Sequence, residues 1–177
     1  SIGEDGASQM ALEDLAMMRS IQDSVVLYPS DAWSMQRCVE LAHERDGLTY
    51  IRSTRAKTPV VNTIKTPIKI GGSRTLKRTK DDVVTVFAAG VTVYEALKAA
   101  DHLKAEGINI RVIDMYSVKP LDLNVIKKAC KETGALIVVE DHYREGGLYE
   151  AICASGVVIR PTCSLGLCNM PQSGTRC

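Results

Sequence analysis

The sequence predicts an α/β protein with three layers and a mainly parallel sheet. Two observations lead to this prediction: short apolar runs alternate with helical patterns, and several of those patterns end at a glycine. Strands that alternate with helices are joined by right-handed crossovers, which place the helices on the faces of a parallel sheet. The chain has 177 residues, of which 45% are hydrophobic and 24% are charged. This is enough for one ordinary domain or two small ones.

The first predicted block covers residues 1–55. Its expected elements are a helix from about Met10 to Arg19, a strand over Val25–Tyr28, a helix that Ser30 or Asp31 caps and that reaches toward Asp46, and a strand over Leu48–Arg52. Pro29 ends the first strand, and Gly47 stops the second helix. Two strands are too few for an independent sheet. We therefore expect this block to be the tail of a larger domain.

A basic segment follows and is predicted to be a linker over residues 56–82. The stretch from about Arg52 to Lys80 holds nine of the 22 lysines and arginines and none of the 21 acidic residues. Such a stripe can mark a site for nucleic acid or for an anionic substrate. It lacks aromatic residues for base stacking, however, and Pro59 and Pro67 suit an extended crossing. A solvated linker is the favoured interpretation, with no nucleic-acid partner.

The second predicted block covers residues 83–177. Its expected elements are a strand over Val83–Ala89, a helix through about Glu106 that Gly107 ends, a strand over Ile108–Met115, a helix over Leu123–Thr133 that Gly134 stops, a strand over Ala135–Asp141, and a helix after Gly146 and Gly147. This βαβαβα order predicts a parallel sheet that helices cover. No element is predicted after residue 155.

Charge and hydropathy exclude several classes of protein. A formal net charge of +1 gives no general attraction to nucleic acid or to a membrane surface. No apolar run approaches the ~20 residues that span a bilayer, and no signal peptide is visible at the N-terminus. The chain lacks an initiating Met and begins within a motif, so we expect a fragment of a longer protein.

The cysteines point to a reducing compartment. There are six of them: Cys38, Cys130, Cys153, Cys163, Cys168 and Cys177. A chain of this size is large for a disulfide-held scaffold. No C-x-x-C pair occurs, and no histidine lies near the last three cysteines to complete a zinc site. We expect reduced, mostly buried thiols, no metal ligands and a cytoplasmic location.

Two charged residues are candidates for binding a small polar ligand. Asp5 lies between Gly3 and Gly6, so little side-chain bulk covers its carboxylate, which suits binding of hydroxyl groups. Arg55 follows a predicted strand, at the end where α/β sheets commonly place ligands. Its guanidinium can hold a phosphate through two parallel hydrogen bonds. From the residues alone, a capped surface turn around Asp5 and an exposed loop arginine are the favoured alternatives.

The run Glu140-Asp141-His142 is the densest group of ionisable side chains. It ends a predicted strand ahead of Gly146 and Gly147, a place that can hold acid–base chemistry. The alternative is that the two acids cap and order this turn. His43 and His102 lie within predicted helices, where surface or packing roles are expected. No catalytic residue is assigned.

Several motifs in order resemble animal-type transketolases. They are IGEDGASQMALEDLAM at residues 2–17, YPSD at 28–31, IRSTR at 51–55, AAGVTVYEAL at 88–97, INIRVIDMYSVKPLD at 108–122 and VVEDHYREGGLYEAI at 138–152. The resemblance spans roughly residues 2–155 and becomes faint afterwards. Deoxyxylulose phosphate synthase and the beta chain of pyruvate dehydrogenase share the C-terminal fold, but SQMALEDLAM and VEDHYREGG favour transketolase.

This resemblance implies a fold and a function. Residues 1–55 would end a pyrimidine-binding domain, and residues 83–177 would form a truncated C-terminal domain with a divergent tail after 155. The parent enzyme would transfer a two-carbon ketol unit between sugar phosphates as a cytoplasmic homodimer. It would use thiamine diphosphate and Mg²⁺ or Ca²⁺.

The resemblance also implies roles for three residues. Asp5 would contact a substrate hydroxyl, Arg55 the sugar phosphate, and Gln9 would lie near cofactor and substrate. The ligands for the diphosphate and the metal are expected outside this chain, so the chain alone is expected to be inactive. A non-catalytic dimerisation or interaction module is the alternative function.

Overall fold

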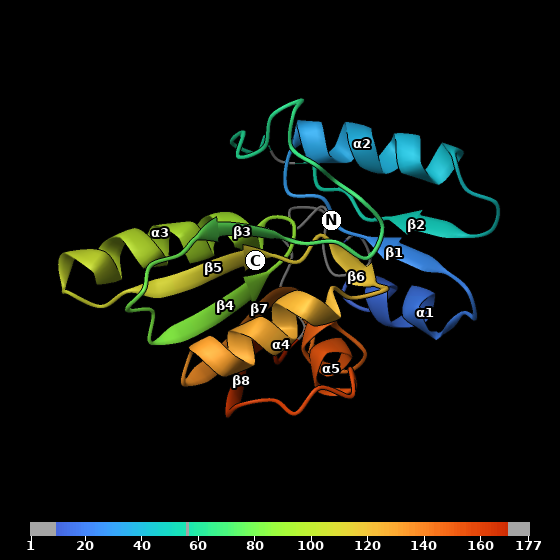
Figure 1. Cartoon of the computed structure of the whole chain (residues 1–177). Helices are drawn as coiled ribbons and strands as arrows, with labels where there is room; N and C mark the ends of the chain where they lie inside the picture. Colours follow the sequence, from blue (N-terminus) through green and yellow to red (C-terminus); the bar gives the residue numbers. More distant parts are fainter. Residues whose placement is uncertain (1–9, 56, 170–177) are drawn as a thin grey trace.

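Two β-sheets organise the residues that the computed structural model describes, which are 10–55 and 57–169. The smaller sheet has the strand order β2-β1-β6 and the larger has β3-β5-β4-β7-β8 (Figure 1). In chain order the elements are α1 (Asp14–Ser20), β1 (Val25–Leu27), α2 (Ala32–His43), β2 (Thr49–Ile51), β3 (Arg74–Lys77), β4 (Val84–Ala88), α3 (Thr92–Ala105), β5 (Ile110–Asp114), β6 (Ser117–Lys119), α4 (Leu123–Glu132), β7 (Ala135–Tyr143), α5 (Leu148–Cys153) and β8 (Thr162–Leu167).

The two helices of the first block begin for different reasons. The first was predicted from about Met10, but α1 begins at Asp14, because Ala11 has a positive φ of 53° that no helix accommodates. The second begins as predicted. Asp31 is its N-cap, accepting a 2.9 Å hydrogen bond from the Ser34 amide, while the Ser34 hydroxyl accepts from the Asp31 amide at 3.0 Å. Of the two predicted N-cap residues, Asp31 is therefore the one that caps this helix, and Ser30 is not.

The smaller sheet takes one strand from the second half of the chain. β1 and β2 are parallel, as predicted, but β6 joins the other side of β1 in the antiparallel direction. The predicted first block therefore gains its third strand from residues that the sequence assigned to the second. Val25 and Leu27 pack toward α2 with Cys38, whereas Val26 packs with Leu15 of α1. The two helices thus cover opposite faces of this sheet (Figure 1).

The larger sheet has β4 at its centre. β4 is parallel to β5 and β7, β7 is parallel to β8, and only the edge strand β3 is antiparallel to its neighbour β5. Val86 and Ala88 pack against α3 on one face, while Phe87 packs on the other face in the cluster that includes residues of α4 and α5. The three-layer α/β fold with a mainly parallel sheet is confirmed.

Three strands lie where none was expected: β6, described above, and the two outer strands of the larger sheet. β3 lies inside the predicted linker, and β8 lies in the predicted tail after residue 155. Both are edge strands of mixed polarity with partly exposed side chains, so neither shows the continuous apolar run of a buried strand. The proposed domain limits at 55, 82 and 155 stay a prediction. Among the described residues, no helix combines the length and the hydropathy needed to cross a membrane.

Candidate functional site

Arg55 lies on the loop that follows β2, and it is exposed. It therefore stands at the carboxyl end of a parallel strand, as predicted. Asp5 and Gln9 lie outside the described residues, so the contact of Asp5 with a substrate hydroxyl and the place of Gln9 near cofactor and substrate stay predictions. Met10, the neighbour of Gln9 in the sequence, is buried, and its carbonyl oxygen accepts a 3.4 Å hydrogen bond from Nη2 of Arg52. The chain at Met10 is thus tied to the residue that opens the Arg55 loop.

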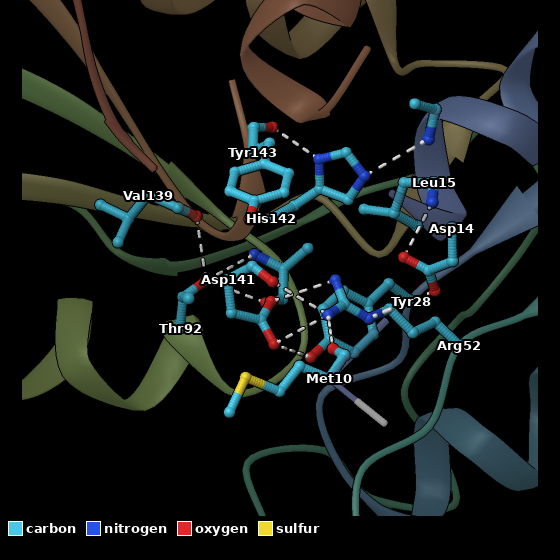
Figure 2. A network of polar contacts seen from close by, with 12 residues as sticks. Met10, Asp14, Leu15, Tyr28, Arg52, Thr92, Val139, Asp141, His142 and Tyr143 are labelled. Atoms are coloured by element: carbon cyan, nitrogen blue, oxygen red, sulfur yellow. Dashed lines mark hydrogen bonds and ion pairs between the residues drawn. The ribbon is translucent and has the colours of Figure 1, made fainter. Parts of the chain in front are cut away.

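Arg52 is the centre of a buried ionic network (Figure 2). Only 1% of it is exposed. Its Nη2 donates to the Asp141 carbonyl oxygen at 2.9 Å and to the Asp141 carboxylate at 3.2 Å, and Nη1 donates to the same carboxylate at 3.3 Å. Nε lies 3.5 Å from Oδ2 of Asp14, an ion-pair distance without hydrogen-bond geometry. One cation from the first block therefore binds a carboxylate from each half of the chain.

Two tyrosines complete this network. The Tyr28 hydroxyl donates to Asp141 at 2.9 Å, and the Tyr50 hydroxyl donates to Asp14 at 2.6 Å. The Tyr28 ring also lies under the guanidinium of Arg52, 4.6 Å from its centroid. Burial and the negative charge of Asp141 raise the pKa of Tyr28, so this hydroxyl keeps its proton and remains a donor. Burial alone would lower the pKa of Arg52, but Asp141 and the other groups of the network together outweigh burial and raise the pKa of the guanidinium.

The carboxyl end of the larger sheet is occupied by the smaller sheet. Gly90, two residues after β4, has a φ of +56°, and a Cβ built on it would lie 2.0 Å from Cζ of Tyr28. The Tyr94 hydroxyl donates to the carbonyl oxygens of Ser30 and, at 2.9 Å, Pro59. Ligands commonly bind at this end of an open α/β sheet. Here side chains of the first block fill that position. The carboxyl end of the larger sheet therefore packs against the smaller sheet.

A second buried polar cluster surrounds Asp114 at the end of β5. Asp114 is fully buried, its Oδ2 accepts a 2.6 Å hydrogen bond from the Ser30 hydroxyl, and its Oδ1 has no partner among the described residues. Asp31 lies nearby and accepts from the amides of Val61 at 2.8 Å and Asn62 at 2.6 Å. Burial raises the pKa of Asp114 to about 7, against the opposing effect of the Ser30 hydrogen bond. A buried carboxyl group therefore titrates near neutral pH.

Replacement of Asp114 by asparagine is expected to stabilise the protein at pH 8 and to have a much smaller effect at pH 4. The carboxyl pKa is higher in the folded state than in the unfolded state, so its contribution to stability is complete below about pH 4 and is lost as pH rises through 7. The buried carboxylate lowers the free energy of unfolding at pH 8, and its removal should restore about 2–4 kcal/mol. Urea unfolding at both pH values measures it, with the exposed Asp46→Asn as control. An Asp114→Asn variant no more stable than wild type at pH 8 would contradict this.

The Glu140-Asp141-His142 run orders the chain around it. Glu140 accepts hydrogen bonds from the amides of Leu148 at 2.6 Å and Tyr149 at 3.1 Å, at the start of α5. Burial raises the pKa of Glu140 to about 7, against these two hydrogen bonds. His142 is buried, and its Nε2 accepts from the Ala16 amide at 3.4 Å. All three side chains have intramolecular partners, which supports the ordering interpretation over an acid–base site.

The cysteines and the possible metal ligands are the remaining candidate groups. Cys38 and Cys130 are buried, but Cys153, Cys163 and Cys168 are exposed, so the prediction of mostly buried thiols is wrong for the described cysteines. The reason is that the last two lie on or directly after the edge strand β8, which has no neighbour on its outer side among the described residues. Residues 10–55 and 57–169 contain no group of three His, Cys, Asp or Glu side chains that could hold a metal ion.

Part of the basic segment is built into the fold. Lys77 pairs with Asp101, and Arg78 pairs with Glu132 at 3.0 Å. Arg74 donates to the carbonyl oxygen of Val61 at 2.7 Å. These contacts attach the segment to α3, α4 and its own first half, which is more structure than the predicted solvated linker has.

Sequence reasoning missed Arg52 and its link to Asp141. The sequence pattern places Arg52 at the end of a predicted strand and makes Asp141 a possible turn-ordering acid. One signal is present: in each half of the chain an uncharged strand run ends in charge, at Arg52 in the first and at Glu140-Asp141 in the second. Pairing between them depends on how the two sheets face each other, which local patterns do not encode.

Most of the chain is similar in sequence to known proteins. Residues 1–60 match the family model of the transketolase pyrimidine-binding domain, and residues 72–159 match that of the transketolase C-terminal domain. Transketolase-like protein 2 of Mus musculus is 49% identical over 180 residues, covering 98% of this chain and 28% of the relative. Transketolase of Homo sapiens is 46% identical over 178 residues, with the same coverage. The chain therefore spans less than a third of the length of these relatives.

Solved structures give the same result. A split-gene transketolase, described as an inactive β4 tetramer, is similar with a TM-score of 0.88 and 37% identity, over 96% of this chain and 56% of that one. Transketolase of Campylobacter jejuni has a TM-score of 0.77 at 23% identity, over 97% of this chain and 26% of that one. The second likeness shows the fold alone.

Proposed function

The chain belongs to the transketolase family, and from this we propose that it supplies part of the sugar-phosphate site of a ketol-transferring enzyme. The reaction would move a two-carbon ketol unit from a ketose phosphate to an aldose phosphate. The observation that carries the proposal is the position of Arg55, exposed on the loop directly after β2. The family match around IRSTR supports the same role.

The proposed roles divide substrate recognition among three residues. Arg55 binds the phosphate of the sugar, because a guanidinium can donate two parallel hydrogen bonds to phosphate oxygens. Asp5 accepts a hydrogen bond from a sugar hydroxyl, and Gln9 lies near the cofactor and the substrate. Arg55 is described by the structure, whereas the roles of Asp5 and Gln9 rest on the resemblance of residues 2–17 to the family.

The cofactor imposes a limit on what this chain does. Thiamine diphosphate supplies the carbanion chemistry in this family, and a protein must orient it. The described residues contain no group of three His, Cys, Asp or Glu side chains that could hold the metal ion of such a site. We therefore assign to this chain only binding and orientation of the sugar phosphate. The parent protein is proposed to act as a cytoplasmic homodimer with Mg²⁺ or Ca²⁺.

Arg55→Ala in the full-length protein is expected to lower kcat/KM selectively for phosphorylated sugars. Loss of a charge-assisted hydrogen bond to phosphate corresponds to about 1.5–3 kcal/mol in kcat/KM. Acceptors without a phosphate should be nearly unaffected. Steady-state kinetics with one phosphorylated and one non-phosphorylated acceptor measures this, and Lys57→Ala, an exposed cation two residues away, is the control. Equal losses for both acceptors would remove Arg55 from the phosphate role.

A non-catalytic interaction module is the second candidate function. It is supported by the similarity to the split-gene transketolase that is described as an inactive tetramer. Turnover of the full-length protein with thiamine diphosphate and Mg²⁺ separates the two candidates. Ketol transfer by that protein supports the enzyme, whereas a stable assembly without turnover supports the module.

A further inference from the structure

The chain just before α1 contains a backbone conformation that needs outside support. Ala11 has a φ of 53°, in the left-handed region that residues with a side chain rarely adopt. Such residues persist where the surrounding structure determines them, and they cluster at functional sites. Ala11 is also two residues after Gln9, one of the proposed recognition residues. The question is which groups hold this turn.

The turn is held on both sides of Ala11. On one side, the carbonyl oxygen of Met10 accepts a 3.4 Å hydrogen bond from Nη2 of Arg52. On the other, the carbonyl oxygen of Leu12 accepts a 3.2 Å hydrogen bond from the amide of Tyr143. Tyr143 ends β7, so one of the two holding groups belongs directly to the second half of the chain.

The other holding group is itself fixed by β7. Nη2 of Arg52, which contacts Met10, also donates to the carbonyl oxygen of Asp141 at 2.9 Å and to its carboxylate at 3.2 Å. The Asp141 carboxylate accepts a further hydrogen bond from Tyr28 at 2.9 Å. Figure 2 shows Arg52 between this carboxylate and Asp14, with Met10 beside it. Removing the charge of Asp141 therefore loosens the side chain that holds Met10.

The same side chain opens the loop that carries Arg55. Arg52 lies three residues before Arg55, and its amide donates to the carbonyl oxygen of Leu27 at 2.9 Å. Between them, this amide and the buried guanidinium fix the start of the loop in position and direction. The chain at Met10 and the loop to Arg55 thus share one support, which is the Arg52–Asp141 pair.

We propose that Asp141 is a positioning residue for the sugar-phosphate site, acting through Arg52 on the loop of Arg55 and on the chain at Met10. The inference rests on the proposed function of Arg55. It gives the C-terminal half of the chain a role in substrate recognition without contact to the substrate. Misplacement of a binding group by as little as about 1 Å is enough to lower a rate substantially.

The test compares Asp141→Asn with Glu140→Gln. Both replace a buried carboxylate of β7 by its amide, but Glu140 contacts the start of α5 and not Arg52. In the full-length protein, Asp141→Asn is expected to lower kcat/KM for a phosphorylated acceptor by about tenfold more than for a non-phosphorylated one. Glu140→Gln is expected to leave that ratio unchanged even if it lowers the melting temperature equally. Equal ratios in the two variants would overturn the proposal.

Two further measurements keep the outcome decisive. Hydrogen exchange of the 177-residue chain should be faster in Asp141→Asn at the amides of Arg52 and Tyr143, which donate to the carbonyl oxygens of Leu27 and Leu12, with α3 unchanged. Unchanged exchange there would also overturn the proposal. Arg52→Lys keeps the positive charge but loses the guanidinium group that donates to Met10. It is the replacement variant if Asp141→Asn does not fold. It should lower kcat/KM for the phosphorylated acceptor, relative to the non-phosphorylated one, by the same factor. If Arg55→Ala itself shows no phosphate selectivity, the proposed function fails, and the exchange result still decides the positioning role.

Discussion

Replacement of Arg52 by methionine is expected to lower the free energy of unfolding by about 3–5 kcal/mol. The loss of its own contacts is the smaller part of this effect. Methionine leaves Asp14 and Asp141 buried without the cation that lies between them. An unpaired buried charge is costly because the interior solvates it poorly. Urea unfolding at pH 7 measures the change.

Two controls separate a buried charge from a lost side chain. Arg37→Met breaks an exposed pair of α2 with Glu40 and with the C-cap Glu44, and it should change the free energy of unfolding little, because solvent screens exposed pairs. The double variant Arg52→Met/Asp141→Leu removes one buried carboxylate together with the cation and should regain part of the loss. If Arg52→Met costs no more than Arg37→Met, the network does not stabilise the junction between the two sheets.

Replacement of Gly90 by alanine is expected to destabilise the protein by about 3–5 kcal/mol. Two costs act together at this position. The φ of +56° disfavours any residue with a side chain, and the new Cβ would lie 2.0–2.5 Å from atoms of the Tyr28 ring. The ring cannot move away easily, because its hydroxyl is bound to Asp141 and its face to Arg52. Thermal unfolding measures the sum of both costs.

Gly107 provides a matched control for the backbone cost. It also has a positive φ, +81°, but a Cβ built on it would meet no atom within 4 Å. Gly107→Ala should therefore cost only about 1 kcal/mol. The difference between the two variants measures the clash with Tyr28. Equal effects would mean that the two sheets separate at little cost to admit the methyl group.

Local signals in the sequence were sufficient for the helices and the central strands. Asp31 was one of two named caps, and the structure shows its capping box with Ser34. Gly47 and Gly107 follow α2 and α3, as predicted from their positions after the periodic segments, and both have positive φ. These features depend on residues within a few positions of each other, so a reading of the chain alone finds them. The strand before Arg55 belongs to the same class.

Long-range pairings were not predictable in this way. β3 and β8 are half-buried edge strands, and their sequences, RTLK and TCSLGL, carry no strong period of their own. Arg52 is charged yet fully buried, because Asp141, 89 residues away, compensates it. Ala11 breaks the predicted first helix for a reason that also lies far away, since Tyr143 holds the neighbouring carbonyl. Of the proposed site, only the place of Arg55 at a strand end followed from local pattern.

The insertion of β6 into the smaller sheet has a consequence for synthesis on the ribosome. β1 and β2 leave the exit tunnel long before Ser117–Lys119, which pair with Val26 and Leu27. Until then one side of β1 is an open edge of apolar residues, the kind of edge that recruits foreign strands. Lys119 later also closes the end of α1, donating to the carbonyl oxygens of Arg19 at 2.9 Å and Ile21 at 2.6 Å. Among the described residues no other strand covers this side of β1, so the pairing that closes the smaller sheet waits for the second half of the chain.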